Sequence, residues 1–195
     1  EPGTRWRYSN AGYVLLGAIL EKAAGRGYEE VIAEQVFEPA GMRDSGFFSP
    51  EDEAPNRAVG YTRMGLDGKP LPGTAPQPIR HGRGGPAGGV WSTAEDLLRF
   101  SEALRTHALL DAETTAAATS MRAESGMGPG AGYGYGFETQ NINGARVFGH
   151  YGGFPGVSAG LEVYPDLGYT VVILSNTDMG GQRVVGRIHD WLTSH

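Results

Sequence analysis

The chain has 195 residues, 39% of them hydrophobic and 10% aromatic, which is enough for one sizeable core and favours a single compact domain. Its formal charge of -6, without a basic stripe, argues against binding nucleic acid, and its longest apolar run, "YVLLGAIL", is far shorter than the roughly 20 residues that span a bilayer. With no cysteine and five scattered histidines, the sequence predicts no disulfide, no metal site and no other cofactor.

Two helices are predicted at the amino end of the chain. From Asn10 to about Ala24, apolar residues recur at helical spacing, and Gly25 offers a left-handed C-terminal stop. The segment from Tyr28 to Phe37 predicts a second helix, because it carries acidic residues in its first turn and Pro39 lies just beyond its end. We expect these two helices to form a hairpin.

Residues 44–90 form a long stretch rich in proline and glycine, in which only "RAVGYTRM" (57–64) predicts a short strand. A structureless loop of this length is uncommon in a compact domain, so we expect the stretch to drape over a binding site. Its segment "GRGGPA" (82–87) formally fits the dinucleotide fingerprint, but it follows no clear strand and opens no immediate helix. We therefore expect this segment to form the rim of a cleft and not a dinucleotide site.

Two further helices are predicted before residue 130. In "STAEDLLRFSEALRT", Ser92 and Glu95 have the spacing of a capping box, and the carboxylates of Glu95 and Asp96 are expected to play structural roles. The segment from Asp111 to Met121 predicts a shorter helix with Asp111 as its N-cap.

After Gly132 the hydrophobic period changes to two, which predicts strands. Four segments rich in β-branched and aromatic residues are separated by turn signals such as "NING" and "PDLG": residues 133–139, 145–151, 157–165 and 169–176. The short connections imply antiparallel pairing. A terminal helix over 181–194 is expected to pack on this sheet through one apolar face, made of Val184, Val185, Ile188, Trp191 and Leu192.

The predicted fold class is therefore α+β. Residues 1–195 are expected to form one partial domain, with a mainly helical and loop region over 1–130 and an antiparallel sheet covered by a helix over 131–195.

Chemistry is suggested at two places, and the local sequence leaves both open. In "GHYGGFPG" (149–156), His150 is surrounded by glycines, which let backbone amides approach a ligand as an oxyanion hole requires. The same pattern is typical of a strand end followed by a tight turn. Near the amino end, Tyr8 and Asn10 are either a packing residue and a helix cap, or two groups that project into a cleft.

The order of several segments along the chain resembles a known family. "PGTRWRYSNAGYVLLGAILEKAAG", "PAGM", "PAGGVWSTAEDLLRF", "YGYGFE" and "GHYGGFPGVSAGLEVYP" together resemble the serine β-lactamase and penicillin-binding-protein-like family. The resemblance covers nearly the whole chain, and it points to the branch that holds class C β-lactamases, D-aminopeptidases, DD-carboxypeptidases and related esterases. It implies part of a β-lactamase/transpeptidase-like fold and, in bacteria, export from the cytoplasm.

The resemblance also implies roles for individual residues. Tyr8 and Asn10 match the Tyr-x-Asn motif, whose tyrosine is the expected general base or proton shuttle, and His150 begins the match to the Lys-Thr-Gly or His-Thr-Gly motif. Together these matches give four expected catalytic residues, Tyr8, Asn10, His150 and Gly153, and three expected substrate-binding residues, Tyr151, Gly152 and Gly88.

The third motif departs from the family pattern in two ways. Histidine in place of lysine gives a weaker, pH-dependent cation. Tyrosine in place of threonine removes a short hydroxyl that helps to grip a substrate carboxylate, so we expect poor recognition of β-lactams.

The family's first motif, Ser-x-x-Lys, has no match in the sequence. The chain has two lysines, Lys22 and Lys69, and the residues three positions before them are Ile19 and Leu66. We therefore expect the chain to be a fragment that lacks the nucleophile and is inactive alone. A sheet without its first strands would have an open edge, so we also expect association with the missing N-terminal segment or self-association.

Two functions stay open at this point. The first is part of a serine hydrolase that forms an acyl-enzyme from a small-molecule or peptide substrate: an ester, a D-amino-acid amide or peptide, or a β-lactam. The second is a non-catalytic ligand-binding or scaffold module that keeps the fold.

Overall fold

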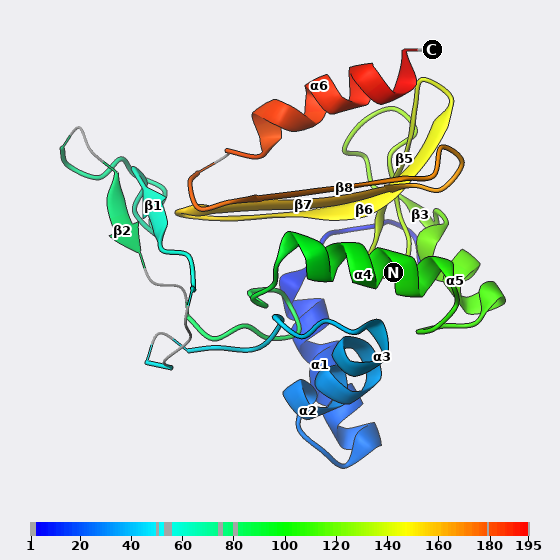
Figure 1. The fold of residues 1–195 in the computed structure, drawn as a ribbon, viewed down its shortest axis with the longest axis horizontal. Coiled ribbons are helices and arrows are strands. Elements are labelled where there is room, and N and C mark those ends of the chain that lie inside the picture. The colour runs from blue at the N-terminus through cyan, green and yellow to red at the C-terminus, as the bar shows by residue number, and fades with distance from the viewer. Residues whose placement is uncertain are drawn as a thin grey trace.

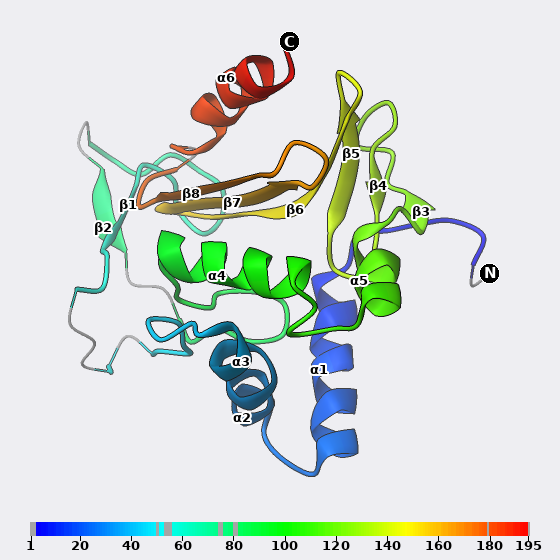
Figure 2. The ribbon, with the colours of Figure 1, turned by 45° about the vertical axis from the view of Figure 1, so that its right-hand side comes forward.

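The protein is built around one antiparallel sheet with helices on both of its faces. The computed structural model describes residues 3–49, 51–52, 56–73, 76–79, 82–178 and 180–194. Helix α6 covers one face of the sheet, helix α4 covers the other, and the amino-terminal helices lie beyond α4 (Figures 1 and 2). This arrangement confirms the predicted α+β class.

The sheet has six strands in the sequential order β3-β4-β5-β6-β7-β8, and every neighbouring pair is antiparallel. The strands are β3 (Ala123–Glu124), β4 (Gly132–Tyr133), β5 (Glu138–Ile142), β6 (Ala145–Phe154), β7 (Val157–Tyr164) and β8 (Tyr169–Ser175). The meander and its last three strands were predicted, whereas β3 was not.

The first predicted strand, 133–139, is wrong as a single element. The chain turns between β4 and β5, where the Gly134 amide donates to the Phe137 carbonyl over 2.7 Å. Gly136 has a φ of 87°, which glycine adopts without the steric cost that other residues incur. Gly134 and Gly136, which interrupt the alternation of the strand pattern, therefore lie in the turn of a hairpin between β4 and β5.

Helix α1 (Asn10–Ala24) has the predicted bounds, and Gly25 ends it in the left-handed conformation with a φ of 68°. The cap at its start is Ser9, whose hydroxyl accepts from the Gly12 amide over 3.0 Å. Asn10 is therefore the first residue of the helix and does not serve as its cap, which leaves its exposed side chain for another role.

The second predicted helix continues further than expected. It runs through α2 (Tyr28–Ile32), a π-helical turn η1 (Ala33–Phe37) and α3 (Glu38–Ala40), so Pro39 lies inside the helical segment and not beyond it. A proline ring crowds the carbonyl four residues before it, and the wider turn η1 makes room for Pro39.

Helices α4 (Ala94–Arg105) and α5 (Ala112–Thr119) lie close to their predicted positions. Asp111 caps α5 as predicted. The predicted cap of α4 was wrong by one residue: Thr93 accepts from the Asp96 amide, whereas the Ser92 hydroxyl pairs with the Ser45 hydroxyl over 2.8 Å.

Helix α6 (Gln182–Thr193) packs on the sheet as predicted, but with a narrower face. Val185 is buried and Ile188 and Leu192 are half-buried, whereas Val184 is exposed and Trp191 is 70% exposed. The five apolar residues therefore do not share one buried face. Val184 and Trp191, seven positions apart, lie together on the solvent side of the helix.

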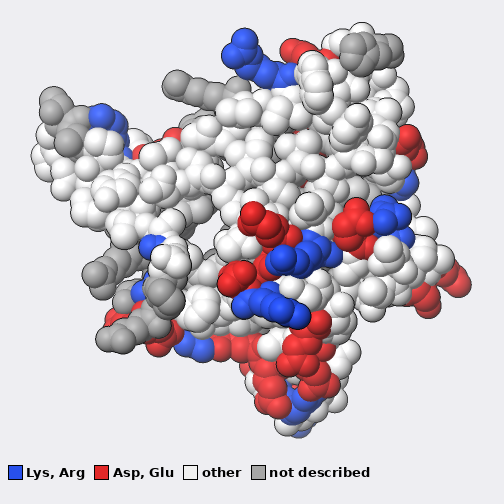
Figure 3. Space-filling model, viewed as in Figure 1, with Lys and Arg blue, Asp and Glu red and all other residues white. Residues whose placement is uncertain are grey.

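Other apolar side chains are also uncovered. Val14, Leu15, Leu16 and Ile19 of α1 are all more than half exposed, and Leu174 is exposed on the edge strand β8. In the view of Figure 3, charged side chains gather over the lower helices, and the area over the sheet is largely uncharged. Among the described residues, no helix is both long and apolar enough to cross a membrane.

The long stretch 44–90 forms a small hairpin of β1 (Gly60–Thr62) and β2 (Gln77–Ile79) that lies at the opposite end of the molecule from β3 and β4 (Figures 1 and 2). Asp178, just after β8, joins this hairpin to the sheet. Its carboxylate accepts from the Thr62 hydroxyl over 2.9 Å, from the Arg63 amide over 3.0 Å and from the Gly156 amide over 2.7 Å. The stretch therefore meets the sheet just beyond Gly153, and whether it covers a binding site stays a prediction.

Replacing Asp178 by asparagine is expected to lower the free energy of unfolding by about 1.5–3 kcal/mol at pH 7, because three donors lose their charged acceptor. Burial alone would raise the pKa of Asp178, but the hydrogen bonds from Gly156, Arg63 and Thr62 outweigh burial and hold the pKa below its usual value. This stabilisation is present above the unfolded-state pKa and is lost as the pH falls through the lower folded-state pKa.

Urea unfolding of the wild type and the Asp178→Asn variant at pH 7 and pH 3 checks this expectation: the difference between the two proteins should narrow in acid. Asp166→Asn, in the exposed turn after β7, is the matched control and should change stability by less than about 0.5 kcal/mol. Equal effects of the two substitutions would contradict the role given to Asp178.

Gly17 is the one buried residue of α1, and it is where the segment 82–90 meets this helix. A Cβ atom added at Gly17 would lie 2.1 Å from Cγ of Pro86, whereas one added at Gly12 would lie 3.5 Å from its nearest neighbour, the Ser9 hydroxyl. The segment expected at the rim of a cleft is thus packed against the middle of α1.

Gly17→Ala is expected to destabilise the protein by about 1–3 kcal/mol through overpacking, although alanine favours helix by about 1 kcal/mol. Gly12→Ala, in the same helix, should be neutral or stabilising. Thermal or urea unfolding of the two variants gives the comparison, and the explanation fails if they are equally stable.

Candidate active site

Tyr8 and His150, which lie 142 positions apart in the sequence, meet in the structure. Tyr8 precedes α1 and His150 lies in β6, and their ring centroids are 6.2 Å apart. Tyr8 is 45% exposed and His150 is half-buried, so solvent and small molecules can reach this place. Residues of the two predicted motifs therefore lie next to each other.

The hydrogen bonds of His150 determine where its proton lies. Nδ1 is 2.6 Å from the carbonyl oxygen of Tyr151, and a carbonyl only accepts, so Nδ1 carries a proton. In the neutral ring, Nε2 then accepts the hydroxyl proton of Tyr133, whose oxygen is 3.0 Å away. Both ring nitrogens thus have partners, one from the backbone of β6 and one from β4.

Tyr133 is a functional candidate that the sequence analysis did not single out. It is buried, and its ring lies against Trp6, Tyr8 and His150 at centroid distances of 5.5, 6.1 and 5.9 Å. Burial raises the pKa of Tyr133, with further contributions from Tyr13 and Tyr8, so its hydroxyl keeps its proton and stays a donor.

A carboxylate also borders the site. Oε1 of Glu138, the first residue of β5, lies 3.8 Å from Nε2 of His150, and its side chain is 27% exposed. Burial raises the pKa of Glu138, His150 acts in the opposite direction, and Glu162 adds to the rise. Glu138 carries no sequence signal of its own beyond its place in the segment "YGYGFE".

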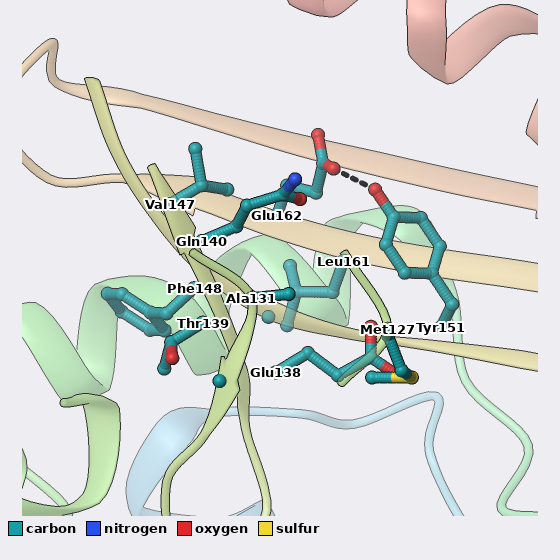
Figure 4. A pocket seen from close by; sticks show the side chains of 12 residues that line it. Met127, Ala131, Glu138, Thr139, Gln140, Val147, Phe148, Tyr151, Leu161 and Glu162 are labelled. Carbon is teal, nitrogen blue, oxygen red and sulfur yellow. Dashed lines mark hydrogen bonds between the residues drawn. The ribbon is translucent and has the colours of Figure 1, made fainter. Parts of the chain in front are cut away.

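The side chain of Tyr151 does not join this site. Its hydroxyl donates to the carboxylate of Glu162, which also accepts from the Tyr164 hydroxyl over 2.8 Å and pairs with Nε2 of His189 over 2.6 Å. Tyr151, Glu162 and Glu138 line a cavity of about 150 Å³. Figure 4 shows the hydroxyl of Tyr151 turned toward the Glu162 carboxylate. Neighbouring residues of a strand point to opposite faces, so Tyr151 faces α6 while His150 faces Tyr8.

The glycines expected in the site lie in two different places. Gly152 and Gly153 follow His150 on β6, and an added Cβ would meet nothing within 4 Å at Gly152 and one backbone atom at 4.0 Å at Gly153, so a ligand has room here. Gly88 is in a tight turn in which its amide donates to the Gly85 carbonyl over 3.0 Å. Nothing in the described contacts joins Gly88 to Tyr8 or His150, and its substrate-binding role stays a prediction.

Within the described part of the chain, no group of three or more histidine, aspartate and glutamate side chains is arranged to hold a metal ion.

The arrangement of phenols around an imidazole, beside a glycine-lined strand, is suited to proton transfer and to hydrogen bonding of an acyl group.

Comparison with known proteins gives the family. The family model described as Beta-lactamase matches residues 1–193, which is nearly the whole chain. The chain belongs to the Beta-lactamase family. This confirms the resemblance, and the known structures of the family confirm the fold.

Three relatives illustrate the similarity. The chain is 34% identical over 188 residues to Penicillin-binding protein 4* of Bacillus subtilis, covering 91% of the chain and 41% of that protein. It is 35% identical over 147 residues to Esterase EstB of Burkholderia gladioli, covering 65% of the chain and 36% of the esterase. The octameric penicillin-binding protein homologue from Pyrococcus abyssi matches 100% of the chain and 43% of its own, with a TM-score of 0.83 and 29% identity.

The chain spans less than half the length of each of these three relatives. The family match shows that the chain belongs to a family of hydrolases. The activity, substrates and partners of the whole protein are proposals.

Proposed function

We propose that this chain supplies the tyrosine and histidine side of the active site of a serine hydrolase that works through an acyl-enzyme. Tyr8 acts as general base or proton shuttle, Asn10 orients the substrate, His150 supports Tyr8, and Gly153 offers an amide to the oxyanion. The serine nucleophile and its lysine come from a segment outside this sequence, since the chain contains no Ser-x-x-Lys.

The observation that carries this proposal is the approach of the Tyr8 and His150 rings to 6.2 Å, next to the open space at Gly152 and Gly153. A tyrosine takes a proton in its phenolate form, which nearby positive charge or hydrogen-bond donors favour, and an acyl group that becomes tetrahedral needs amides close by. Relatives named penicillin-binding protein and esterase support acyl chemistry on an ester, an amide or peptide, or a β-lactam.

The test is covalent labelling of the longer protein with a fluorophosphonate or a fluorescent penicillin, followed by intact mass. We expect one labelled serine outside this sequence in the longer protein and none in the isolated chain. A longer protein with no labelled serine would contradict the proposal.

A non-catalytic binding module is the second candidate, and the missing Ser-x-x-Lys is the observation that favours it. It predicts saturable binding of an ester or peptide without turnover. Prolonged incubation of the longer protein with p-nitrophenyl esters separates the two functions, because the hydrolase releases p-nitrophenol and the binding module does not.

We also propose that the uncovered apolar surface of the chain associates with another segment or another copy. Val14, Leu15, Leu16 and Ile19 on α1, Trp191 on α6 and the edge strand β8 support this proposal, and a relative is described as octameric. Analytical ultracentrifugation of the isolated chain, with and without the preceding segment, tests it. A chain that is monomeric in both cases, with no binding between the two parts, would contradict it.

A further inference from the structure

The site beside His150 offers hydrogen-bond acceptors where a cation would be needed to hold an anion. Nδ1–H of His150 donates a hydrogen bond to the Tyr151 carbonyl oxygen, which is 2.6 Å away. The lone pair of Nε2 receives the Tyr133 hydroxyl, at 3.0 Å. A neutral imidazole held by these two partners has no further proton to give to a ligand.

The next two residues of β6 supply no side-chain donor either. The hydroxyl of Tyr151 is bonded to Glu162 on the α6 face, where Figure 4 shows it turned toward that carboxylate. Glu162 is only 4% exposed and is held by Tyr164 and His189 as well, so this bond belongs to a packed cluster and the hydroxyl stays there. Gly152 has no side chain.

A carboxylate lies near His150 in addition to the two phenols: that of Glu138, which pairs with Gly149 across β5 and β6. Glu138 Oε1 is 3.8 Å from Nε2, and the side chains of Glu138 and His150 are 27% and 32% exposed, so a small ligand can reach both. Around the imidazole lie Tyr8, Tyr133 with its neighbour Tyr13, and Glu138, with Glu162 acting on Glu138 from β7. A phenol is a weaker hydrogen-bond donor to an anion than a cationic side chain is, and a carboxylate repels an anion.

We propose that the subsite beside His150 repels anions and accepts a hydrogen-bond donor, with Glu138 as the residue that determines this preference. The acyl substrate then carries no carboxylate next to His150: it is a neutral ester or amide, or an acyl compound with an ammonium group at that position. This inference rests on the proposed function, because it concerns the substrate of the same site.

The experiment uses this chain and needs no turnover. The protein is labelled with ¹⁵N at histidine, and the ring signals of His150 are followed by NMR during titration with three probes of similar size: propylammonium, propionamide and propionate. The titrations are run at pH 8, because burial raises the pKa of Glu138 and the carboxylate must be ionised. Propylammonium and propionamide are expected to shift the His150 signals saturably, and propionate is expected not to.

Glu138→Gln removes the charge and keeps the shape, so it should weaken propylammonium binding by about two- to fivefold. Asp67→Asn removes the same charge at an exposed turn, in the stretch that lies at the far end of the molecule from β5, and should leave all three titrations unchanged. The control separates an effect of Glu138 from the overall charge of -6.

The inference is overturned if propionate binds the wild type as tightly as propylammonium, if none of the probes binds, or if Glu138→Gln and Asp67→Asn behave alike. The comparison of the three probes in the wild type decides the matter even where a variant does not fold. Because the readout does not involve a nucleophile, a longer protein without a labelled serine would end the proposed function while this titration still reports on the subsite.

Discussion

Tyr8→Phe in the longer protein should lower kcat by about 10²–10⁴-fold, because it removes one oxygen that is proposed to move the proton of the serine nucleophile. The ring contacts of Tyr8 with Trp6, Tyr133 and His150 do not depend on its hydroxyl, so the variant should fold and bind substrate with little change in KM. The measurement is steady-state hydrolysis of a p-nitrophenyl ester.

The matched control is Tyr135→Phe, which removes a hydroxyl from a tyrosine that is 66% exposed and lies under Arg122. Its ring keeps the contact with Arg122, and kcat should stay within about twofold of the wild type. If Tyr8→Phe retains the activity of Tyr135→Phe, Tyr8 is a packing residue, and the assignment of the base is wrong.

Asp96→Ala is expected to cause the largest loss of stability, about 3–5 kcal/mol in the free energy of unfolding. Asp96 is fully buried, and its carboxylate accepts from the Asp44 amide over 2.7 Å, the Ser45 hydroxyl over 2.8 Å and Nη1 of Arg99 over 2.5 Å. Truncation leaves these donors without their acceptor, and it frees the start of the long stretch 44–90 from α4. Urea unfolding followed by circular dichroism measures the effect.

Glu95→Ala is the control for Asp96→Ala, since Glu95 is the neighbouring carboxylate in the same first turn of α4 and is exposed. Its loss should cost no more than about 1 kcal/mol, the contribution of a charge near a helix start. A cost below about 1 kcal/mol for Asp96→Ala as well would contradict the anchoring role of Asp96.

Much of the fold follows from local patterns. The bounds of α1, the stop at Gly25, the cap at Asp111 and the last three strands depend on periodicity and turn chemistry, which are properties of short segments. The errors fall where tertiary packing decides. Ser92 and Thr93 are both capable caps, and the pairing of Ser92 with Ser45, far away in sequence, leaves Thr93 for the helix.

The candidate site was predicted only in part. The meeting of Tyr8 with His150 followed from the family resemblance, because no local signal relates residues so far apart. Tyr133 and Glu138 come close to His150 because β4 and β5 form a hairpin that pairs with β6. One strand was predicted over 133–139, and that prediction therefore did not include this hairpin. The place of Tyr151 could have been predicted, since adjacent residues of a strand cannot both point into one site.

A crystal structure of the longer protein with a phosphonate bound to its nucleophilic serine would show whether Tyr8 and His150 face a single acyl-binding site. We expect an oxygen bonded to the phosphorus, or the serine oxygen itself, to lie within about 3.2 Å of the Tyr8 hydroxyl, with His150 lining the same cavity. A labelled serine in a different cavity, or a Tyr8 ring that packs away from the phosphonate, would contradict it.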